Sequence, residues 1–459
     1  TMPSSITLTA RFDLGEDREF RHVPFDVPEG TRQVHIEITY NDRIGSSPML
    51  TGGNTLDIGL FDQQGIESGS PGLRGWSGSN KTEITIDTDW ATPPYRAGNI
   101  GAGTWHLLLS AYKIGPNGLD VEARVEFDNG HTPPEIPPVR NLAEIQRAFL
   151  PLPAEPNWYR GDLHQHTVYS DGDSYPHEVA AIAYEIGLDF YGITDHNRAQ
   201  SPVDLVPHGE GWPVLVPGVE VTTYAGHFNV WGTHRWYDFR HPTQEGIQAA
   251  VNAAKEDGGF VSLNHPKPFG PPWDFPDVSG FDAIEVWNGW WGRLNNISTA
   301  YWADALNYDS HERWHVGVGG SDVHRNRQHG SAVNPMSDAV MGFPTLWVQT
   351  DEPLSETSIL EAVRAGRCFI SESPAGPQLY ARREGDEVHA RVVGAEGDAL
   401  MAVGPHGCLA ASAITDRDQT FSWPVADLRD HGPYVRFEVH TPTSGIRALC
   451  NPVWFDDPR

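Results

Sequence analysis

The sequence predicts a mixed α/β protein whose centre is a TIM-like barrel, flanked by an N-terminal β-sandwich or jelly-roll-like domain and a small C-terminal β domain. Three observations support this fold class. Apolar runs alternate with helical patterns through the middle of the chain, as βα units do. Polar and apolar residues alternate with a period of two in both flanking regions. Residues able to bind metal ions stand at the ends of the central runs, where α/β barrels place their chemistry.

The N-terminal region consists of short alternating runs separated by clusters of glycine, asparagine, aspartate and proline. This pattern is typical of an antiparallel sandwich or jelly roll. The runs lie at residues 6–12, 34–40, 56–61, 81–86, 105–109 and 121–127. The Pro-rich stretch 132–138 then predicts a stiff linker. We therefore expect a domain over residues 1–131 and a linker over residues 132–157.

After the linker, the pattern changes to that of helices and buried strands. Helical periodicity is found at residues 177–186, 243–254 and 355–365. Gly366 is well placed to end the last of these helices. Strand-like alternation returns at residues 387–393. We expect a barrel domain over residues 158–375 and a C-terminal β domain over residues 376–459.

Composition limits the classes of protein that fit. Lys and Arg number 32 against 61 Asp and Glu, which gives a net charge of −29. The chain therefore lacks the basic composition that usually accompanies nucleic-acid binding. Three cysteines without C-x-x-C spacing cannot form a disulfide framework. The sequence has no run of 18 consecutive apolar residues, so it predicts no membrane-spanning helix. Its first residues lack the pattern of a signal peptide. A cytoplasmic enzyme is the default expectation, with a removed signal peptide and self-association both left open.

The most informative stretch is HQHTVYSDG, from His164 to Gly172. Alternate residues of a strand point to the same face, so His164 and His166 can bind one ion together, with Asp171 following closely. In isolation, a polar loop with two incidental histidines explains the pattern equally well. Ligand-type residues downstream favour a metal site. Those at or near the ends of short apolar runs are Asp195, His196, Glu220, His227, His265, Glu285, Asp322 and His324.

Five sequence blocks over residues 160–325 follow one another in a recognisable order: H-x-H-x4-D-G, T-D-H-N, G-V-E with a later histidine, N-H-P, and G-S-D-V-H. Together they resemble the PHP (polymerase and histidinol phosphatase) family of metal-dependent hydrolases. The resemblance implies a distorted (β/α)7 TIM-like barrel. The β-rich N-terminal region and the closing segment 448–453 are similar to the carbaryl-hydrolase-like branch of that family.

The resemblance also divides the ligands among three metal positions, as a trinuclear centre. His164, His166, Glu220 and Asp322 would hold the first ion; Glu220, as a bridge, would hold the second with His227 and His265; Asp171, His196 and His324 would hold the third. Many relatives have histidine at the position of Asp171, so we expect two or three divalent ions. Mixed imidazole and carboxylate ligation suits manganese, zinc or iron.

The expected chemistry follows from this ligand set. Two ions that share Glu220 could hold a water and lower its pKa toward about 7, which makes a metal-bridging hydroxide the expected nucleophile. By likeness to other metal hydrolases, Asp322 would carry the proton to the leaving group, with His324 as a second catalytic candidate beside it. Ser170 and Ser321 flank ligands but have no Ser-His-Asp partner set.

The substrate is less closely determined. Lys267, Arg198 and Arg325 stand beside ligands and could bind a phosphate, although each could equally be a surface ion-pair partner. The favoured function is therefore a phosphoesterase acting on a small phosphomonoester or phosphodiester. Aromatic residues in the same region are Trp273, Trp287, Trp290, Trp291, Tyr301, Trp302 and Trp314. They either pack the barrel or line an apolar pocket, which would suit a carbamate, aryl ester or amide. A non-catalytic metal- or carbohydrate-binding protein is the alternative from another class.

Overall fold

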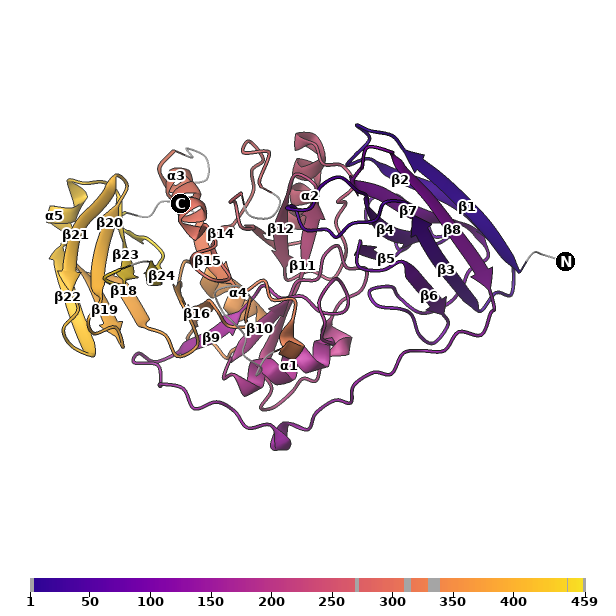
Figure 1. The fold of residues 1–459 in the computed structure, drawn as a ribbon. Helices are drawn as coiled ribbons and strands as arrows, with labels where there is room; N and C mark the ends of the chain where they lie inside the picture. The colour runs from indigo at the N-terminus through magenta and orange to yellow at the C-terminus, as the bar shows by residue number, and fades with distance from the viewer. Residues whose placement is uncertain (1–3, 269–271, 309–314, 329–338, 444, 457–459) are drawn as a thin grey trace.

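The computed structural model describes residues 4–268, 272–308, 315–328, 339–443 and 445–456. The fold is mixed α/β, and strands dominate over helices. Three groups of elements follow one another along the chain, and an extended segment passes beneath the central group to connect it with the N-terminal strands (Figure 1). None of the helices in the described ranges is long and apolar enough to cross a membrane.

Two four-stranded antiparallel sheets form the N-terminal part. One has the order β1 (Ser5–Phe12), β8 (Leu119–Phe127), β3 (Gln33–Tyr40) and β6 (Glu83–Asp87); the other has the order β2 (Phe20–Val27), β7 (Gly103–Lys113), β4 (Thr55–Phe61) and β5 (Leu73–Gly78). Side chains such as Val34, Ile36 and Trp105 form one buried cluster from both sheets. The sequence patterns did not predict β2 or β5, because Pro24 interrupts the first and two glycines weaken the second.

Seven strands form the central run of a much larger sheet. Their order is β15 (Val316–Gly320), β14 (Ala283–Asn288), β13 (Phe260–Leu263), β12 (Gly226–Trp231), β11 (Val214–Thr223), β10 (Phe190–Ile193) and β9 (Trp158–Asp162). Neighbouring strands are parallel except at β12, which is antiparallel to both β11 and β13. Only residues 224–225 link β11 to β12, so no crossover helix separates them.

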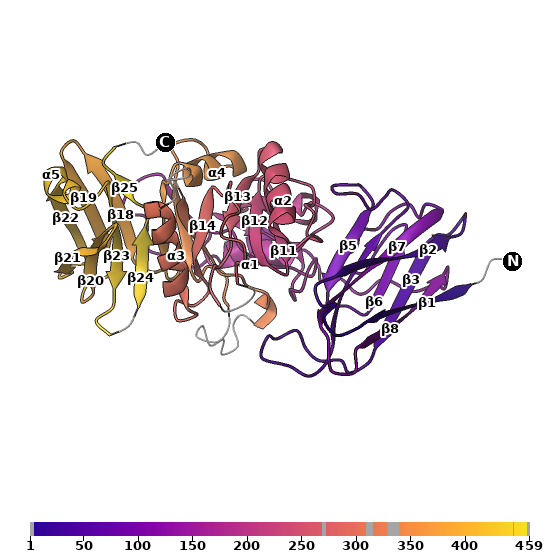
Figure 2. The same ribbon diagram turned by 90° about the horizontal axis from the view of Figure 1, so that it is seen from above.

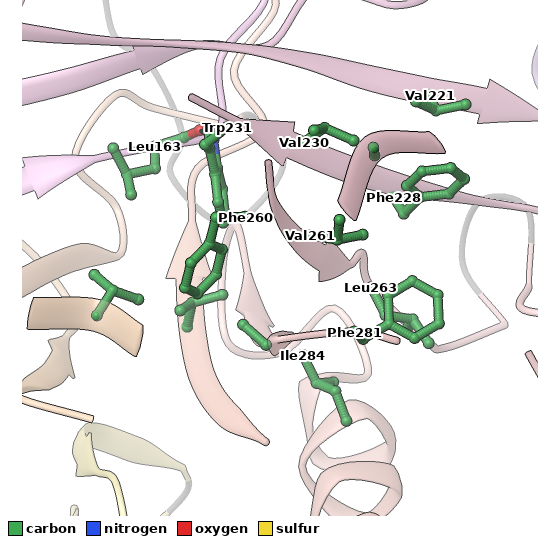
Figure 3. Close-up of a cluster of buried hydrophobic side chains, with 14 of the residues drawn as sticks. Leu163, Val221, Phe228, Val230, Trp231, Phe260, Val261, Leu263, Phe281 and Ile284 are labelled. Carbon is green, nitrogen blue, oxygen red and sulfur yellow. Dashed lines mark hydrogen bonds between the residues drawn. The ribbon is translucent and has the colours of Figure 1, made fainter. Parts of the chain in front are cut away.

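Large apolar side chains pack between these strands and the surrounding helices. Figure 3 shows Phe228, Val230 and Trp231 of β12 beside Phe260 and Val261 of β13. The indole N–H of Trp231 donates to the backbone carbonyl of Leu163, at 3.0 Å. A well-packed core of this kind fixes strand register, and register decides which side chains reach the ends of the strands.

The two ends of the seven-strand run meet just beyond β9 and β15. Gln165 and Val323 form an isolated parallel bridge. The backbone N–H of Asp322 donates to the carbonyl of His164 at 2.9 Å, and the N–H of His166 donates to the carbonyl of Val323 at 3.0 Å. An isolated bridge, rather than a ladder between assigned strands, connects these ends, so the closed barrel remains a prediction.

Helices α1 to α4 lie beside the central sheet (Figure 2). The predicted helices coincide with α1 (Pro176–Glu185), α2 (Gln244–Glu256) and α4 (Glu356–Arg364), and Gly366 follows the last one with a φ of +75°. The side chains of Thr243 and Ser355 cap α2 and α4. The sequence patterns did not predict α3 (Asn295–Tyr308), whose first half is rich in Asn, Ser and Thr. Short 3-10 turns lie at Leu142–Glu144, Val203–Leu205 and Asn326–Gln328.

Most of the C-terminal strands extend the central sheet, and the others form a second sheet. From β9 the order runs through β16 (Thr345–Gln349), β17 (Cys368–Ser371), β24 (Ile446–Cys450), β23 (Tyr434–His440), β20 (Ala399–Gly404) and β21 (Gly407–Ala413), with β25 (Val453–Trp454) paired to β23. A second sheet contains β18 (Gln378–Glu384), β19 (Glu387–Val393) and β22 (Asp418–Pro424), which α5 (Val425–Arg429) follows. The predicted boundary at residue 376 is thus crossed by strand pairing between β17 and β24.

Candidate metal centre

Four of the predicted ligands form one tight cluster at the end of the central strands. The Nε2 atoms of His164 and His166 lie 3.4 and 3.2 Å from Oε2 of Glu220. The same two nitrogens lie 3.3 and 2.9 Å from Oδ1 of Asp322. Both histidines therefore face the same pair of carboxylates, as their spacing in the sequence suggests. This is the group assigned to the first ion by resemblance.

The other oxygen of Glu220 faces a second group. Its Oε1 lies 3.1 Å from Nδ1 of His227 and 3.3 Å from Nε2 of His265, and it accepts a hydrogen bond from Nδ2 of Asn264 at 2.8 Å. Oε2 of Glu220 also lies 3.0 Å from Nδ1 of His196, whose backbone bridges that of Glu220. Glu220 thus stands between the first and second groups, which is the position a bridging ligand requires.

Asp171, His196 and His324 form the third group. Oδ1 of Asp171 lies 3.1 Å from Nε2 of His324 and 3.5 Å from Nε2 of His196. The ring of His166 stacks on both histidines, with centroids 4.1 and 4.3 Å apart. Nδ1 of His196 is 2.5 Å from Oγ1 of Thr222, a contact that orients its Nε2 toward Asp171. The nine residues predicted as ligands therefore lie together in three adjoining groups.

The geometry of these residues fits divalent cations. Two ligand atoms that share an ion at ~2.0–2.2 Å stand roughly 3.0–3.5 Å apart, which is the spacing found here. Nε2 of His164 and Oε2 of Glu220 are buried and make no hydrogen bond within the described residues. Buried polar atoms normally find a partner, so these two indicate a place for an ion. Nitrogen and oxygen donors without a thiolate suit zinc, manganese or iron.

The charges within the cluster compensate one another. Burial disfavours the charged ring of His164, but Glu285, Asp322 and Glu220 outweigh it and hold the pKa of His164 well above its ordinary value. Burial likewise disfavours the carboxylate of Glu220, but the surrounding histidines hold its pKa well below the usual range. Asp171 outweighs burial at His324 and raises that pKa to about 9. The carboxylates therefore require positive charge close by, which protons or metal ions can supply.

Glu285 orients a ligand from behind. Its Oε1 lies 2.8 Å from Nδ1 of His164, and its Oε2 accepts hydrogen bonds from the backbone N–H of His265 at 3.1 Å and from Nδ2 of Asn288 at 3.2 Å. Asn288 also donates to Oδ2 of Asp322 at 3.3 Å. Carboxylates in this position fix the tautomer and ring plane of a metal-binding histidine. The sequence showed Glu285 only as a ligand-type residue in a buried strand.

Two further buried aspartates hold the loops that carry the ligands, and sequence reasoning did not assign them this role. Asp195 accepts hydrogen bonds from the backbone N–H of Thr167 at 2.7 Å and from Oγ of Ser170 at 2.6 Å. Asp162 accepts from the backbone N–H of Ser321 at 3.1 Å and that of Gly342 at 2.9 Å, and burial raises its pKa to about 6. The signal available in the sequence was a carboxylate at the end of an apolar run.

The backbone around the ligands adopts conformations that few residues accept. His265, Asp322 and Asn197 have φ values of +27°, +55° and +44°. Such residues persist where the surrounding structure compensates for the strain, which is common at functional sites. A Cβ on Gly172 would lie 2.7 Å from the backbone of His166, and one on Gly320 would lie 2.5 Å from Cβ of His164. Glycine at these two positions allows the ligand segments to approach closely.

The three cationic candidates are placed differently. Lys267 is buried, and its Nζ donates to the carbonyl of Asn288 at 3.2 Å and to Oδ1 of Asn295 at 3.0 Å; burial lowers its pKa to about 8. Arg198 is buried and donates to the carbonyls of Gly218 and Thr233, so it supports the backbone. Arg325 is exposed, one residue after His324.

The aromatic residues divide between the core and the surface. Trp287 and Trp302 are buried in the central hydrophobic cluster, where the indole N–H groups donate to the carbonyls of Gly289 and His315, both at 2.9 Å. Trp273, Trp291 and Tyr301 pack against the same cluster, Trp290 is exposed, and Trp314 lies outside the described residues. These placements favour packing over a substrate pocket as the main role of the group.

The N-terminal strands reach the edge of the cluster. Trp76 of β5 lies edge-on to the ring of His196, with centroids 6.5 Å apart. Nδ2 of Asn80 donates to the carbonyl of Ser170 at 3.2 Å. In the same interface, the hydroxyl of Tyr224 donates to Oδ2 of Asp57 at 2.5 Å. Residues far from the motifs in sequence therefore pack against the loops that carry the ligands.

No protein-family model matches the chain. A search of curated proteins gives no match either. Among solved structures, one similar protein is a two-domain protein from Bacteroides vulgatus, named as containing a predicted PHP-like metal-dependent phosphoesterase. It is 19% identical to this chain, and the alignment covers 68% of this chain and 99% of that one, with a TM-score of 0.39. A protein from Bifidobacterium adolescentis, named for a proposed metal-dependent phosphoesterase activity, is 15% identical over 44% of this chain and 95% of its own, with a TM-score of 0.28.

Proposed function

We propose that this protein is a metal-dependent hydrolase of the PHP type and that its substrates are phosphoesters. The observation that carries the proposal is the position of Glu220, fully buried, with imidazole nitrogens of His164, His166, His227 and His265 within 3.4 Å of its two oxygens. Burying several ionisable groups together is costly and is seldom retained for stability alone. A functional metal centre explains the concentration of these groups.

The proposal assigns each residue a role. His164, His166, Glu220 and Asp322 hold one divalent ion; Glu220, His227 and His265 hold a second; Asp171, His196 and His324 hold a third. When bound, such ions act as Lewis acids and lower the pKa of coordinated water. Manganese, zinc or iron would serve. The same proposal includes a distorted (β/α)7 barrel and membership of the carbaryl-hydrolase-like branch. It also includes three domains, over residues 1–131, 158–375 and 376–459, with a linker over residues 132–157.

Asp322 is the proposed proton carrier. Its Oδ1 faces His166 at 2.9 Å, while its Oδ2 accepts a long hydrogen bond from Asn288 at 3.3 Å. About a quarter of the side chain, 23%, is exposed, unlike the buried Glu220. The side chain of Asp322 is therefore exposed enough to reach a leaving group, to which it would pass a proton. His324, 30% exposed and next to Arg325, lies at the same open edge.

Lys267 supports the choice of a phosphoester. An ammonium group has three N–H donors, and Nζ of Lys267 uses two of them on Asn288 and Asn295. The third can donate to a phosphoryl oxygen, which carries negative charge throughout the reaction. Carbamate, aryl-ester or amide hydrolysis is the alternative, and it loses support because Trp287 and Trp302 are core residues.

A substrate panel tests the proposal. Purified protein is assayed with p-nitrophenyl phosphate, bis-p-nitrophenyl phosphate and naphthyl carbamate, each with added Mn²⁺ or Zn²⁺. We expect metal-dependent turnover of a phosphoester that the Asp322→Asn variant lacks. Turnover of the carbamate alone would select the alternative substrate class. Absence of all three activities in protein that binds metal would favour a non-catalytic role.

A further inference from the structure

A second group of potential ligands lies on the N-terminal sandwich. His35 of β3 faces away from the sandwich core, because its neighbours Val34 and Ile36 point into that core. It is nevertheless only 1% exposed. The ring of His131 covers it, with centroids 3.6 Å apart and an interplanar angle of 16°. An outward-facing histidine is thus buried by a second histidine, which lies just before the linker.

Both histidines present an unpartnered nitrogen toward acidic side chains. Nε2 of His35 lies 3.7 Å from Oε1 of Glu83, and Nε2 of His131 lies 3.7 Å from Oε2 of Glu126. Neither nitrogen makes a hydrogen bond within the described residues, although both are shielded from solvent. The ligand atoms of His35, Glu83 and His131 lie within 4.8 Å of one another. A buried nitrogen without a partner is costly, and a cation would remove that cost.

Hydrogen bonds hold the backbone of His131 and the ring of His35 in place. The side-chain amide of Gln33 donates to the carbonyl of His131 and accepts from its backbone N–H, both at 2.9 Å. Oγ1 of Thr85 lies 2.8 Å from Nδ1 of His35. When this hydroxyl accepts a hydrogen bond from Nδ1–H, the lone pair of Nε2 is left for a ligand. Such outer partners orient histidines in metal sites.

We propose that His35, His131 and Glu83 form a mononuclear site for a Zn²⁺-class divalent cation, separate from the cluster around Glu220. Two neutral imidazoles and one carboxylate are a common ligand set for such ions. Glu126 stays outside the coordination shell, because Arg124 and Asn129 already bind its oxygens.

Binding requires the ligands to move closer together. Their ligand atoms lie within 4.8 Å of one another, a looser spacing than the ~3.4 Å edge of a tetrahedral shell. The ring of His131 must also turn out of its stack on His35, because the lone pair of a ring nitrogen lies in the ring plane and two nearly parallel rings with centroids 3.6 Å apart do not point at one ion. The side chains best able to move are those of Glu83, which is 66% exposed, and His131, which is 33% exposed. The ion would then attach His131, the residue just before the linker, to the outer face of β3.

Anomalous diffraction at the zinc edge tests this site directly, on crystals of the whole chain grown with Zn²⁺ as the only added metal. We expect a peak ~2.0–2.1 Å from Nε2 of both His35 and His131. The His131→Ala variant should lose this peak and keep those around Glu220, while the control His406→Ala, which removes an exposed histidine elsewhere, should keep them all. No peak at Nε2 of both histidines in the native chain would overturn the proposal and leave a stacked histidine pair.

Equilibrium dialysis against Zn²⁺ gives a second measure that does not depend on hydrolase activity. The native chain should bind one more ion than His131→Ala, and the Glu83→Gln variant, changed at an exposed side chain, provides the same comparison if His131→Ala misfolds. Thr85→Val should weaken this site about 10–100-fold, as loss of an outer partner does. Equal zinc stoichiometry in the native chain and both ligand variants would contradict the proposal.

Discussion

The carboxylate of Glu285 lies 2.8 Å from Nδ1 of His164, so the opposite nitrogen of that ring is directed at Glu220 and Asp322. This pair links a buried central strand, β14, to the first residue of the H-x-H motif. It suggests that the strength of metal binding depends on residues that do not touch the ion.

Replacing Glu285 by Gln should therefore weaken metal binding about 10–100-fold, the usual effect of losing a carboxylate behind a ligand histidine. The dissociation constant can be measured by competition with a chromophoric chelator. Glu256→Gln, at the end of α2, is the matched control and should bind metal as the native chain does. Unchanged affinity in Glu285→Gln would show that His164 is oriented by other contacts.

Removal of Glu220 should be more damaging than removal of any one histidine. Its two oxygens face different groups, so Glu220→Ala should lose two ions, whereas His227→Ala should lose only one. Elemental analysis of undialysed protein gives the number of ions per chain. Equal losses in the two variants would contradict the bridging role.

Asp171→Ala tests whether the third group decides the reaction class. A phosphoryl group offers several oxygens to three cations, whereas an acyl centre develops a single oxyanion. Phosphoester turnover should therefore fall by about 10²-fold, and ester or carbamate turnover should fall much less. The comparison needs kcat for both substrate classes in the same preparation. Equal losses would make the third ion structural.

The interface between the N-terminal strands and the central sheet should make stability depend on pH. Burial raises the pKa of Asp57 to about 7, against opposing contributions from Tyr224 and His196. A raised pKa means that the folded state binds the proton more tightly, so this stabilisation is complete below about pH 4 and is lost as pH rises through 7. The whole change is of the order of 4 kcal/mol.

Urea unfolding of metal-free protein between pH 4 and pH 8 measures this effect. Relative to the Asp57→Asn variant, the native chain should lose stability across that range. Asp17→Asn, at an exposed position of the same region, should follow the native chain. Parallel curves for the native chain and Asp57→Asn would show that the carboxyl group is ionised in the folded state throughout.

Much of this organisation could be predicted from sequence because it depends on local patterns. The apolar runs at β10, β13 and β15 and the helical periodicity of α2 are signals carried by neighbouring residues. The grouping of the nine candidate ligands was implied by the resemblance to the PHP family. Strand β12 was expected among βα units, but its antiparallel pairing depends on a short turn whose geometry the alternation pattern does not encode.

Other features depend on contacts between distant residues and left no local signal. The roles of Asp162 and Asp195 appear only when their hydrogen-bond partners are known. The contact between Trp76 and His196 joins residues that are 120 positions apart in the sequence. Helix α3 forms although its first half is rich in poor helix formers, because Trp302 on it packs into the core.

The bridge between Gln165 and Val323 has a consequence for the order in which the centre assembles. His166 and Asp322 face each other across 156 positions of sequence, and only the completed turn of the sheet brings them together. During synthesis, the H-x-H motif leaves the ribosome long before its partner carboxylate exists. In the proposed centre, the first and third ions can therefore be captured only after β15 has been made and docked, because Asp322 and His324 follow that strand. Loading of these two positions would be a late step that reports the completion of folding.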